Sequence, residues 1–550
     1  MRLLLRVPDV MVDKDVLIVG GGPVGLTLGC LLRSYGINCC IIEKHAERLK
    51  QSRAFSLHAR TVELLDILGL GSWIRSDAFQ VDRMTIYSDK KPIINFDFSH
   101  LKPYGDPCIF SYPQHRLEQL LESRFVALGG RLRYATELQT LEQHRDHVGV
   151  ELAQGAHTSH ECYRYVVGCD GKNSQVRDLM GTGFTGKSYD NRFLVCDGVL
   201  DTTQVFEARD LSQAQTQAQG HTYLTSDGYA MLFPLPGGMH RVVVDLTAES
   251  RSSAPADLEV LLMERLKLIG LPHIGFRNVH WISEASLAAR IAEEFCLGRV
   301  VLAGDACHVH SPIGGQGINL GIQDAFNLAW KLSLTCKGHS DDSLLQTYHH
   351  ERYAAAESVL KKTDRMHHLF TSPHPLKSLI RDRFLPVLGR LEVVNRAQVM
   401  SISGLGHDYG EGRKGVLRQS KARRGARIAN LELRRQGKSV GLYEFLGSDR
   451  FLVLGYGVEG PLPEIPAFML KHVNFIHVSA DDDASAYTFC PSRQVLKRDH
   501  GIVAPCFLFI RPDGYLQEVI EMMPMFDALC EIRNFLIKNN ILITGLKSRS

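Results

Sequence analysis

The stretch Asp15-Val-Leu-Ile-Val-Gly20-Gly-Gly-Pro-Val-Gly25, together with Cys39-Cys-Ile-Ile-Glu43, decides the fold of this chain. The short apolar runs at 15–19 and 39–42 predict buried strands, and the segment between them predicts a helix that ends near Tyr35. A strand, a glycine-rich turn, a helix and a second strand make a βαβ unit, so the sequence predicts a parallel sheet.

The glycines of this turn have the spacing of a dinucleotide-binding loop. Gly20 permits the tight turn, Gly22 lets a pyrophosphate approach the backbone, and Gly25 lets the helix pack closely on the strand. Glu43 ends the second strand at the spacing expected for the acid that binds an adenosine ribose. We include the adjacent Lys44 among the expected cofactor contacts.

Two later strands end in the same manner. Tyr165-Val-Val-Gly168 leads to Asp170-Gly171, and Val300-Val-Leu-Ala303 leads to Gly304-Asp305 and a glycine-dense loop. An acid beside such a loop suits a polyol phosphate, because the carboxylate accepts hydrogen bonds from hydroxyls and a helix N-terminus faces negative charge. The alternatives are a helix start capped by Asn173 or Ser174 for the first segment, and a tight turn for the second.

Composition narrows the class of protein. The 550 residues are 44% hydrophobic and 22% charged with a formal net charge of +3, which is typical of a globular chain of about three or four domains. The small charge argues against nucleic acid as a partner, and the absence of a long apolar run argues against a membrane span. The 13 cysteines lack Cys-x-x-Cys spacing, so we expect a reduced, cytoplasmic protein. The segment before Met11 is too short and interrupted for a signal peptide, and Met11 is an alternative start.

Changes of pattern along the chain suggest an α/β protein with an inserted sheet. Residues 13–190 and 285–410 are expected to form the two parts of a Rossmann-like nucleotide-binding domain, the second part including a helical segment. Alternating apolar runs in 191–284 predict an antiparallel substrate-binding sheet. Residues 411–439 are polar and basic and predict a linker, and 440–550 predict a small separate domain.

The final domain resembles the thioredoxin fold in one hairpin. A strand over 504–510, with Pro505 near its start, is followed by a turn at Arg511-Pro-Asp-Gly514. The resemblance implies a cis peptide at Pro505. Without two facing thiols there is no dithiol exchange, so we expect a structural or oligomerisation role, which is compatible with a homodimer.

Taken together, the three glycine–acid sites resemble those of the class A flavoprotein monooxygenases, the FAD-dependent aromatic hydroxylases, over about residues 13–400. The C-terminal domain extends the resemblance to the branch of phenol hydroxylase and 3-(3-hydroxyphenyl)propionate hydroxylase. The resemblance implies that FAD is the cofactor, that Asp170-Gly171 serves both FAD and NAD(P)H, and that Asp305 holds the ribityl chain. The family usually has alanine where this chain has Cys307.

The same resemblance implies further flavin contacts. Arg53 lies in a stretch whose arginine approaches the flavin, and Gln114 matches a flavin-binding glutamine. The loop expected to wall the isoalloxazine ring contains Pro312, Gly315, Gly317, Ile318 and Asn319.

The reaction implied by the resemblance is hydroxylation of a phenolic or polyketide-like aromatic ring. NAD(P)H reduces the flavin, oxygen adds at the flavin C4a atom to give a hydroperoxide, and one oxygen atom passes to the ring. The cofactor carries the difficult chemistry, while the protein orients it and excludes water. No second nucleotide-binding fold is evident, so NAD(P)H is expected to visit a shared cleft.

The sequence names no firm catalytic residue. Pro312 and His308 lie closest to the flavin loop, and for His308 we favour a structural hydrogen bond over acid–base catalysis. His308-Val-His310 lacks a third ligand, so no metal site is expected. His221, Tyr223 and Tyr229 in the inserted sheet are candidate substrate contacts, with aromatic core packing as the more ordinary interpretation.

Three other functions remain open from the sequence. The same scaffold can insert oxygen by Baeyer–Villiger chemistry, or work as a flavin reductase or dehydrogenase without oxygen. A carrier that keeps the nucleotide fold without catalysis is the non-enzymatic alternative, because a fold alone does not fix function. The substrate, the position oxidised, the choice between NADH and NADPH, and the oligomeric state are not determined by the sequence.

Overall fold

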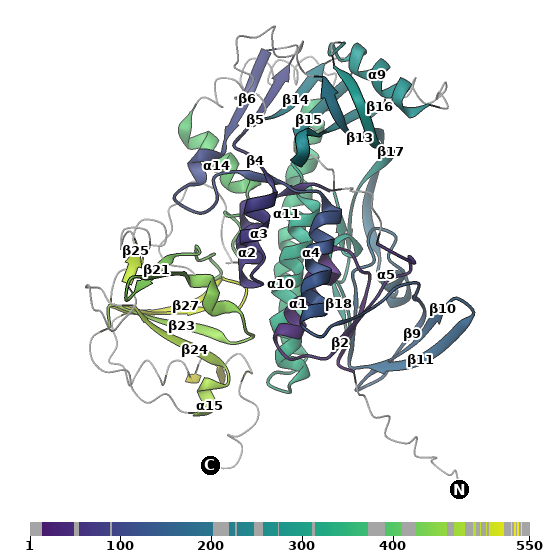
Figure 1. Ribbon diagram of the computed structural model, residues 1–550. Coiled ribbons are helices and arrows are strands. Elements are labelled where there is room, and N and C mark those ends of the chain that lie inside the picture. Colours follow the sequence, from purple (N-terminus) through teal and green to yellow (C-terminus); the bar gives the residue numbers. More distant parts are fainter. Residues whose placement is uncertain are drawn as a thin grey trace.

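A computed structural model gives the architecture of the chain (Figure 1). It describes residues 14–48, 54–88, 91–201, 219–225, 228–246, 257–272, 274–310, 314–371, 391–409, 424–458, 467–478, 488–490, 496, 502, 505–521, 530, 533–534, 536–537 and 541.

The expected parallel sheet is present. Its strand order is β18-β19-β12-β1-β2-β8, and all neighbouring pairs are parallel except β18 with β19. Its strands are β1 (Val16–Val19), β2 (Cys39–Ile42), β8 (Arg131–Arg133), β12 (Tyr165–Gly168), β18 (Cys296–Leu297) and β19 (Val300–Leu302). Strands β1, β2, β12 and β19 are buried throughout, which is why their sequences are continuous apolar runs without alternation.

Helices pack on this sheet and form the centre of the molecule. Helix α1 (Pro23–Ser34) lies against α4 (Gln114–Ala127) and α10 (Gly317–Cys336). The contact is close at Gly29, where a Cβ atom would lie 2.8 Å from the Ile41 side chain and 2.9 Å from Phe125. Helix α10 is buried along nearly its whole length, and it runs beside α11 (Ser343–Thr371) in the middle of Figure 1.

The inserted sheet has eight strands in the order β20-β17-β13-β16-β15-β14-β5-β6. Its strands are β5 (Arg83–Ser88), β6 (Lys91–Asp97), β13 (Phe184–Asp201), β14 (Gln219–Thr225), β15 (Gly228–Pro234), β16 (His240–Leu246), β17 (Gly275–Ala292) and β20 (His308–Val309). Helix α9 (Leu258–Leu268) packs against it.

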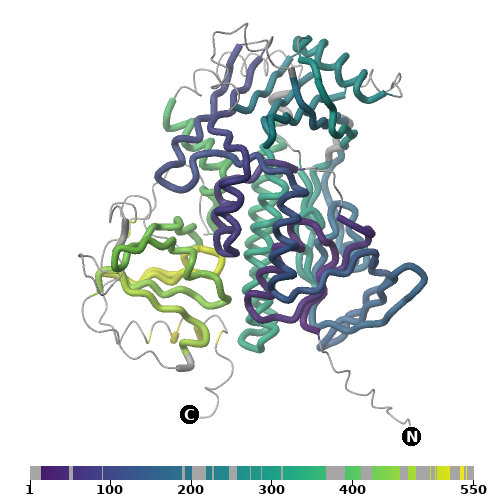
Figure 2. The backbone as a smooth tube through the Cα atoms, viewed as in Figure 1, coloured from purple at the N-terminus to yellow at the C-terminus, as the bar shows by residue number. Residues whose placement is uncertain are grey.

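The boundary of this sheet differs from the sequence prediction. Strands β5 and β6 come from the segment that we had assigned to the nucleotide-binding domain, and β5 pairs in parallel with β14. Figure 2 shows this early part of the chain beside the later strands of the same sheet. Local alternation reveals a strand, but it does not reveal which distant strand will be its neighbour.

Smaller elements complete the first two domains. They are β3 (Ser56–Leu57), β4 (Phe79–Val81), β7 (Ile109–Ser111), β9 (Glu137–Gln143), β10 (Val148–Gln154), β11 (His157–Tyr163), α2 (Ala59–Ile67), α3 (Gly71–Asp77), α5 (Gln175–Met180), α14 (Glu392–Ile402), η1 (Phe98–Leu101), η2 (Pro236–Gly238) and η3 (Gly304–Ala306).

The C-terminal region contains a four-stranded sheet in the order β24-β23-β26-β27. Strands β23 (Phe451–Tyr456) and β24 (Val473–Val478) are parallel, while β26 (Cys506–Ile510) and β27 (Leu516–Glu521) run antiparallel to their neighbours. A second sheet contains β21 (Glu432–Arg435), β22 (Lys438–Gly441) and β25 (Thr488–Cys490). Helix α15 (Ala467–Leu470) and η5 (Leu442–Leu446) belong to the same region.

The predicted linker over 411–439 is only partly correct. Residues 411–423 lie outside the described residues, but β21 and β22 form a hairpin, and Arg427 is buried. A basic residue with no acidic residue near it in the sequence is predicted to be exposed to solvent. Here the counter-charge is Glu63, which is 364 positions away in the chain.

A buried ionic cluster fastens this region to α2. The Glu63 carboxylate accepts hydrogen bonds from Arg60 at 2.7 Å and from Arg427 at 2.8 and 2.5 Å. Arg60 also donates to the Tyr443 hydroxyl and to the Asp513 carbonyl in the C-terminal region. Burial raises the pKa of Glu63, but the guanidinium groups of Arg427 and Arg60 outweigh that effect and lower the pKa below its ordinary value. The cluster therefore stabilises the docked arrangement at neutral pH and weakens as the pH falls through the acidic range.

We expect Glu63→Gln to destabilise the protein by about 3–5 kcal/mol, because it leaves two buried guanidinium groups without their counter-charge. Urea unfolding followed by fluorescence should show a lower midpoint at pH 7, and the difference from the wild type should shrink only as the pH falls below about 4.5. Asp146→Asn is the matched control, since its side chain is 82% exposed and should change stability little. An unchanged midpoint for Glu63→Gln would contradict the structural role of this cluster.

Candidate functional site

The glycine–acid segments meet at one edge of the parallel sheet. Val19 pairs with both Ile42 and Gly168, and Gly168 pairs with Leu302, so four strands end in register. The carboxyl ends of parallel strands are where open α/β sheets bind ligands. The residues that follow them are Gly20, Glu43, Asp170 and Gly304-Asp305, as the sequence predicted.

The first turn has the shape of a phosphate-binding loop. Gly20 has a φ of +111°, and a Cβ there would overlap the Cys169 carbonyl, while a Cβ at Gly25 would overlap the Gly20 carbonyl. Gly22, in contrast, faces open space, with no atom within 4 Å of an added Cβ. Helix α1 begins there without a side-chain cap, so its first amides are available to an anion.

Glu43 lies directly beside this loop. Its carboxylate accepts a hydrogen bond from the Gly21 amide at 2.9 Å and from the His45 amide at 3.0 Å. Lys44 is exposed in the loop that follows β2. The acid is thus held at the mouth of the glycine turn, where it would meet a ligand whose phosphates sit on α1.

Asp170 serves the start of α5. Its carboxylate accepts hydrogen bonds from the Ser174 hydroxyl at 2.5 Å and from the amides of Gln175 and Val176 at 2.7 and 3.1 Å. Ser174 in turn caps the helix by accepting from the Arg177 amide at 3.0 Å. The helix-cap interpretation of this segment is therefore confirmed, and Asp170 contributes to the edge by fixing its loop.

Gly304 and Asp305 form the opposite side of the edge. Gly304 has a φ of +67°, and a Cβ there would lie 2.9 Å from Val24 of α1. Asp305 is exposed, although its neighbours from Val300 to His308 are all buried. Asp305 is therefore outside the buried core, directly after the left-handed turn at Gly304.

A buried carboxylate holds the loop at Gly304 in place through hydrogen bonds. Asp324 on α10 accepts hydrogen bonds from the Gly304 amide at 3.0 Å, from His308 Nε2 at 2.8 Å and from Arg352 Nε at 2.6 Å. His308 thus makes the structural hydrogen bond expected of it. Because only 1% of its surface is exposed, it is a poor candidate for contact with a substrate.

The glycine loop before α10 is held by Asn319. Its amide nitrogen donates to the carbonyls of Ser56 and Gly315 at 2.8 and 2.7 Å, and its oxygen accepts from the His58 amide and the Thr61 hydroxyl. The side chain is buried and fully used in these bonds. It fixes the loop, a role that its place in the sequence did not reveal.

The other residues expected around the flavin ring are placed as follows. Gly315 packs against Ser56, while Gly317 faces open space at the start of α10, which has no side-chain cap. Ile318 is partly buried. Gln114 accepts a hydrogen bond from the Ala54 amide at 3.1 Å. Arg53 and Pro312 lie outside the described residues.

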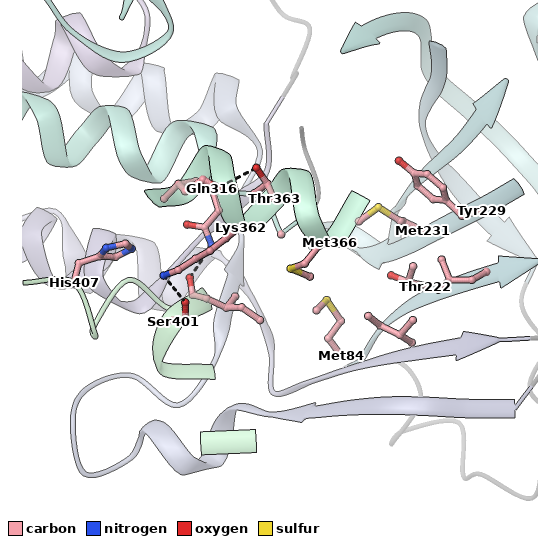
Figure 3. Close-up of a pocket in the computed structure, with 15 residues that line it drawn as sticks. Met84, Thr222, Tyr229, Met231, Gln316, Lys362, Thr363, Met366, Ser401 and His407 are labelled. Atoms are coloured by element: carbon pink, nitrogen blue, oxygen red, sulfur yellow. Dashed lines mark hydrogen bonds between the residues drawn. The ribbon is translucent and has the colours of Figure 1, made fainter. Parts of the chain in front are cut away.

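A pocket opens between this loop and the eight-stranded sheet (Figure 3). It encloses about 810 Å³, counted to its open mouth. The lining residues are Met84, Ile86, Thr222, Leu224, Tyr229, Met231, Gly314, Gln316, Val359, Lys362, Thr363, Met366, Ser401, Ile402 and His407.

One of the three predicted substrate contacts lines this pocket. Tyr229 does so, and its buried hydroxyl has no hydrogen-bond partner in the part of the chain that the structure describes. His221 and Tyr223 do not, because successive side chains of a strand point to opposite faces. They pack near Tyr87 on the other face of the sheet, and Thr222 and Leu224 face the pocket in their place. For His221 and Tyr223, the alternative of aromatic packing agrees with these ring contacts.

The pocket residues of α11 and α14 were missed by the sequence analysis. Val359, Lys362, Thr363 and Met366 share one face of α11 at helical spacing, as their common place in the lining shows. That spacing was visible in the sequence, but it equally describes a helix packed in a core. Nothing in the sequence indicated that this face meets strands β5 and β14.

The family model described as FAD binding domain matches residues 13–363. Rifampicin monooxygenase of Streptomyces venezuelae is 35% identical over 451 residues, covering 80% of this chain and 87% of that protein. The 12-dehydrotetracycline 5-monooxygenase/anhydrotetracycline 6-monooxygenase of Streptomyces rimosus is 32% identical, covering 91% of this chain and 94% of that protein. The solved structure of anhydrotetracycline hydroxylase from Streptomyces rimosus has a TM-score of 0.76 at 30% identity, covering 94% of this chain and 98% of that one.

The chain therefore belongs to the FAD-binding-domain family of flavin-dependent aromatic monooxygenases, and it is an FAD-dependent enzyme. The site fits this cofactor, because the open backbone at Gly22 and Gly317 and the two uncapped helix starts leave amides for its phosphates and ring. Within the described residues, no helix has the length and apolar character needed to cross a bilayer.

Asp305→Ala should weaken FAD binding by about tenfold or more, the usual effect of losing a hydrogen bond to a charged group. The purified variant should release its yellow colour on dilution, while Asp146→Ala, on an exposed turn, should keep it. A variant at position 305 that retains a wild-type flavin spectrum at nanomolar concentration would exclude this role.

Glu118 provides a pH-dependent test of the same region. It accepts a hydrogen bond from Gln114 at 2.8 Å, and burial raises its pKa to about 7. The folded protein then binds this proton more tightly than the unfolded chain, so Glu118 costs stability as the pH rises from 5 to 8. Thermal unfolding of the flavin-free protein should show Glu118→Gln gaining stability relative to wild type over that range. Glu142→Gln, whose side chain is 81% exposed, should show no such trend.

Proposed function

We propose that this enzyme uses NAD(P)H, FAD and molecular oxygen to hydroxylate a phenolic or polyketide-like aromatic ring. The observation that carries the proposal is the position of the apolar pocket, which is lined by Gly314 and Gln316 of the loop that leads into α10. A ring bound in the pocket would therefore lie against the loop where this family's flavin ring is expected.

The proposed contacts along the sheet edge fall into two groups, one for each half of FAD. Gly20, Gly22, Gly25 and Glu43 would bind the adenosine and pyrophosphate half, with Asp305 on the ribityl chain. The amides of the loop around Gly315 and Gly317 would face the isoalloxazine ring. The open space at Gly22 and Gly317 and the exposure of Asp305 support this arrangement.

The chemistry of the pocket favours a substrate with apolar rings, because most of its lining side chains are apolar. Methionine, leucine and isoleucine side chains form the wall on the sheet side, which suits flat apolar rings. Two of the relatives are named for rifampicin and anhydrotetracycline, and we infer a substrate of similar class here.

When bound, FAD supplies the redox chemistry, namely reduction by NAD(P)H and activation of oxygen at the flavin C4a position. The balance is one ring C–H, O₂, NAD(P)H and a proton converted into one ring C–OH, water and NAD(P)⁺. The protein orients the ring on the apolar wall and keeps water from the reacting atoms. Tyr229 lines the pocket and is our candidate for a packing contact with the substrate ring, since its hydroxyl is itself buried.

We also propose that the parallel sheet is Rossmann-like and that the C-terminal sheet is thioredoxin-like without a redox pair. In the latter, a parallel pair is continued by two antiparallel strands, and Pro505 directly precedes β26. Its contacts with Arg60 support a structural role.

Purified holoenzyme should oxidise NADPH or NADH faster when 1-naphthol or 2-hydroxyanthraquinone is added, with matching oxygen uptake. Under ¹⁸O₂ the product should gain one labelled oxygen atom as a hydroxyl group. A labelled lactone or ester from a ketone substrate would instead indicate Baeyer–Villiger insertion. Stimulated NAD(P)H oxidation without oxygen incorporation would indicate a reductase, and no stimulation by any ring compound would contradict the proposed function.

A further inference from the structure

The substrate pocket has two chemically different ends. Toward the sheet it is lined by apolar and sulfur-containing side chains, among them Met84, Met231 and Met366. At the other end Figure 3 shows Lys362, Ser401 and His407 gathered between α11 and the end of α14. An apolar cavity with a few polar groups at one end fixes the direction in which a ligand enters.

Lys362 brings a positive charge to this polar end of the pocket. Its ammonium donates a hydrogen bond to the Ser401 hydroxyl at 3.3 Å. No carboxylate in the described part of the chain lies within 4.0 Å of it. The neighbouring acids of α11 are already engaged, since Glu357 pairs with Lys361 at 2.7 Å and Asp364 pairs with Lys187 at 2.7 Å.

Lys362 is an exposed residue, so its ammonium keeps contact with water. Partial burial against the pocket lowers the pKa of Lys362. His407 lines the same end of the pocket. Burial, followed by the charges of Lys362 and Arg352, lowers the pKa of His407 to about 3. The imidazole is therefore neutral at physiological pH, and it adds a polar contact without competing for an anion.

We propose that Lys362, with Ser401 beside it, binds an anionic oxygen of the aromatic substrate and so sets which edge of the ring system faces the flavin loop. The inference rests on the proposed function in one respect, that this pocket is the substrate site. An ammonium has three donors, of which Ser401 takes one. The anionic group occupies the remaining donors, while the apolar rings extend along the methionines toward Met84 and Met231.

In this role Lys362 selects the substrate and positions it in the pocket. Charge-assisted hydrogen bonds are about twice as strong as neutral ones. A ring that carries a carboxylate, or an ionised phenol or enol, is therefore selected over its neutral counterpart. Because the charge sits at one end only, such a substrate binds in a single direction.

The test compares matched ligands on the FAD-loaded enzyme by isothermal titration calorimetry. Anthraquinone-2-carboxylate and anthraquinone-2-carboxamide share the ring system and differ in charge. The wild type should bind the carboxylate about tenfold more tightly than the carboxamide, the usual worth of a charge-assisted hydrogen bond. K362M should lose that preference while binding the carboxamide as before, and K362R should keep most of it.

The matched control is K361M. Lys361 is the adjacent residue of the same helix, but it pairs with Glu357 and does not line the pocket. The variant makes the same change in net charge, so it should keep the wild-type preference. 2-Hydroxyanthraquinone, titrated on both sides of its own pKa, separates a preference for phenolate from one for carboxylate.

A preference for either anion that disappears only in K362M supports the proposal. Equal binding of charged and neutral ligands by the wild type overturns it, as does a preference that survives in K362M or is lost equally in K361M. Because binding is measured without turnover, the anion-binding role of Lys362 and the proposed hydroxylase function can be refuted independently. An enzyme that selects anions through Lys362 but consumes no oxygen would refute the proposed function and leave this inference intact.

Discussion

The buried carboxylate of Asp324 is the interaction on which the rest of the site depends. It joins the Gly304 amide, His308 and Arg352, and thereby ties the loop after β19 to α10 and α11. Burial raises the pKa of Asp324, but the charge of Arg352 and the contact with His308 outweigh it and keep the pKa below its ordinary value. An ionised carboxylate without solvent is tolerated only when paired in this way, so the loop has little freedom to move from its position.

Helix α11 carries this constraint from the cofactor edge to the substrate pocket. Arg352 reaches Asp324 from one part of the helix, and Lys362 and Met366 line the pocket about 15–20 Å further along, from the rise of an α-helix. The glycine loop between the two is held independently by Asn319. The geometry of the proposed reaction therefore depends in part on buried side chains that hold the loop and the helices in place.

The two halves of the site differed in how well the sequence predicted them. The cofactor edge was predictable because each part has a local signature: Gly20, Gly25 and Gly304 occupy positions where the backbone leaves no room for a Cβ atom. The pocket was not predictable, because it depends on which strands pair with each other and on which face of a strand each side chain occupies. A one-residue error along β14 exchanges Tyr223 for Leu224 and moves the side chain to the other face of the sheet. The burial of Arg427 was not predictable for a related reason, since its partner Glu63 is distant in sequence.

The sequence by itself determined the parallel sheet, the positions of its glycine turns, the acids at its strand ends and hence the cofactor class. These features arise from steric limits within a few consecutive residues. Only the tertiary structure decided that β5 joins the inserted sheet, that α11 lines the pocket, and that no carboxylate of the described residues pairs with Lys362 there. The physical reason is that burial and charge pairing arise between residues brought together by folding, and neither has a local pattern in the chain.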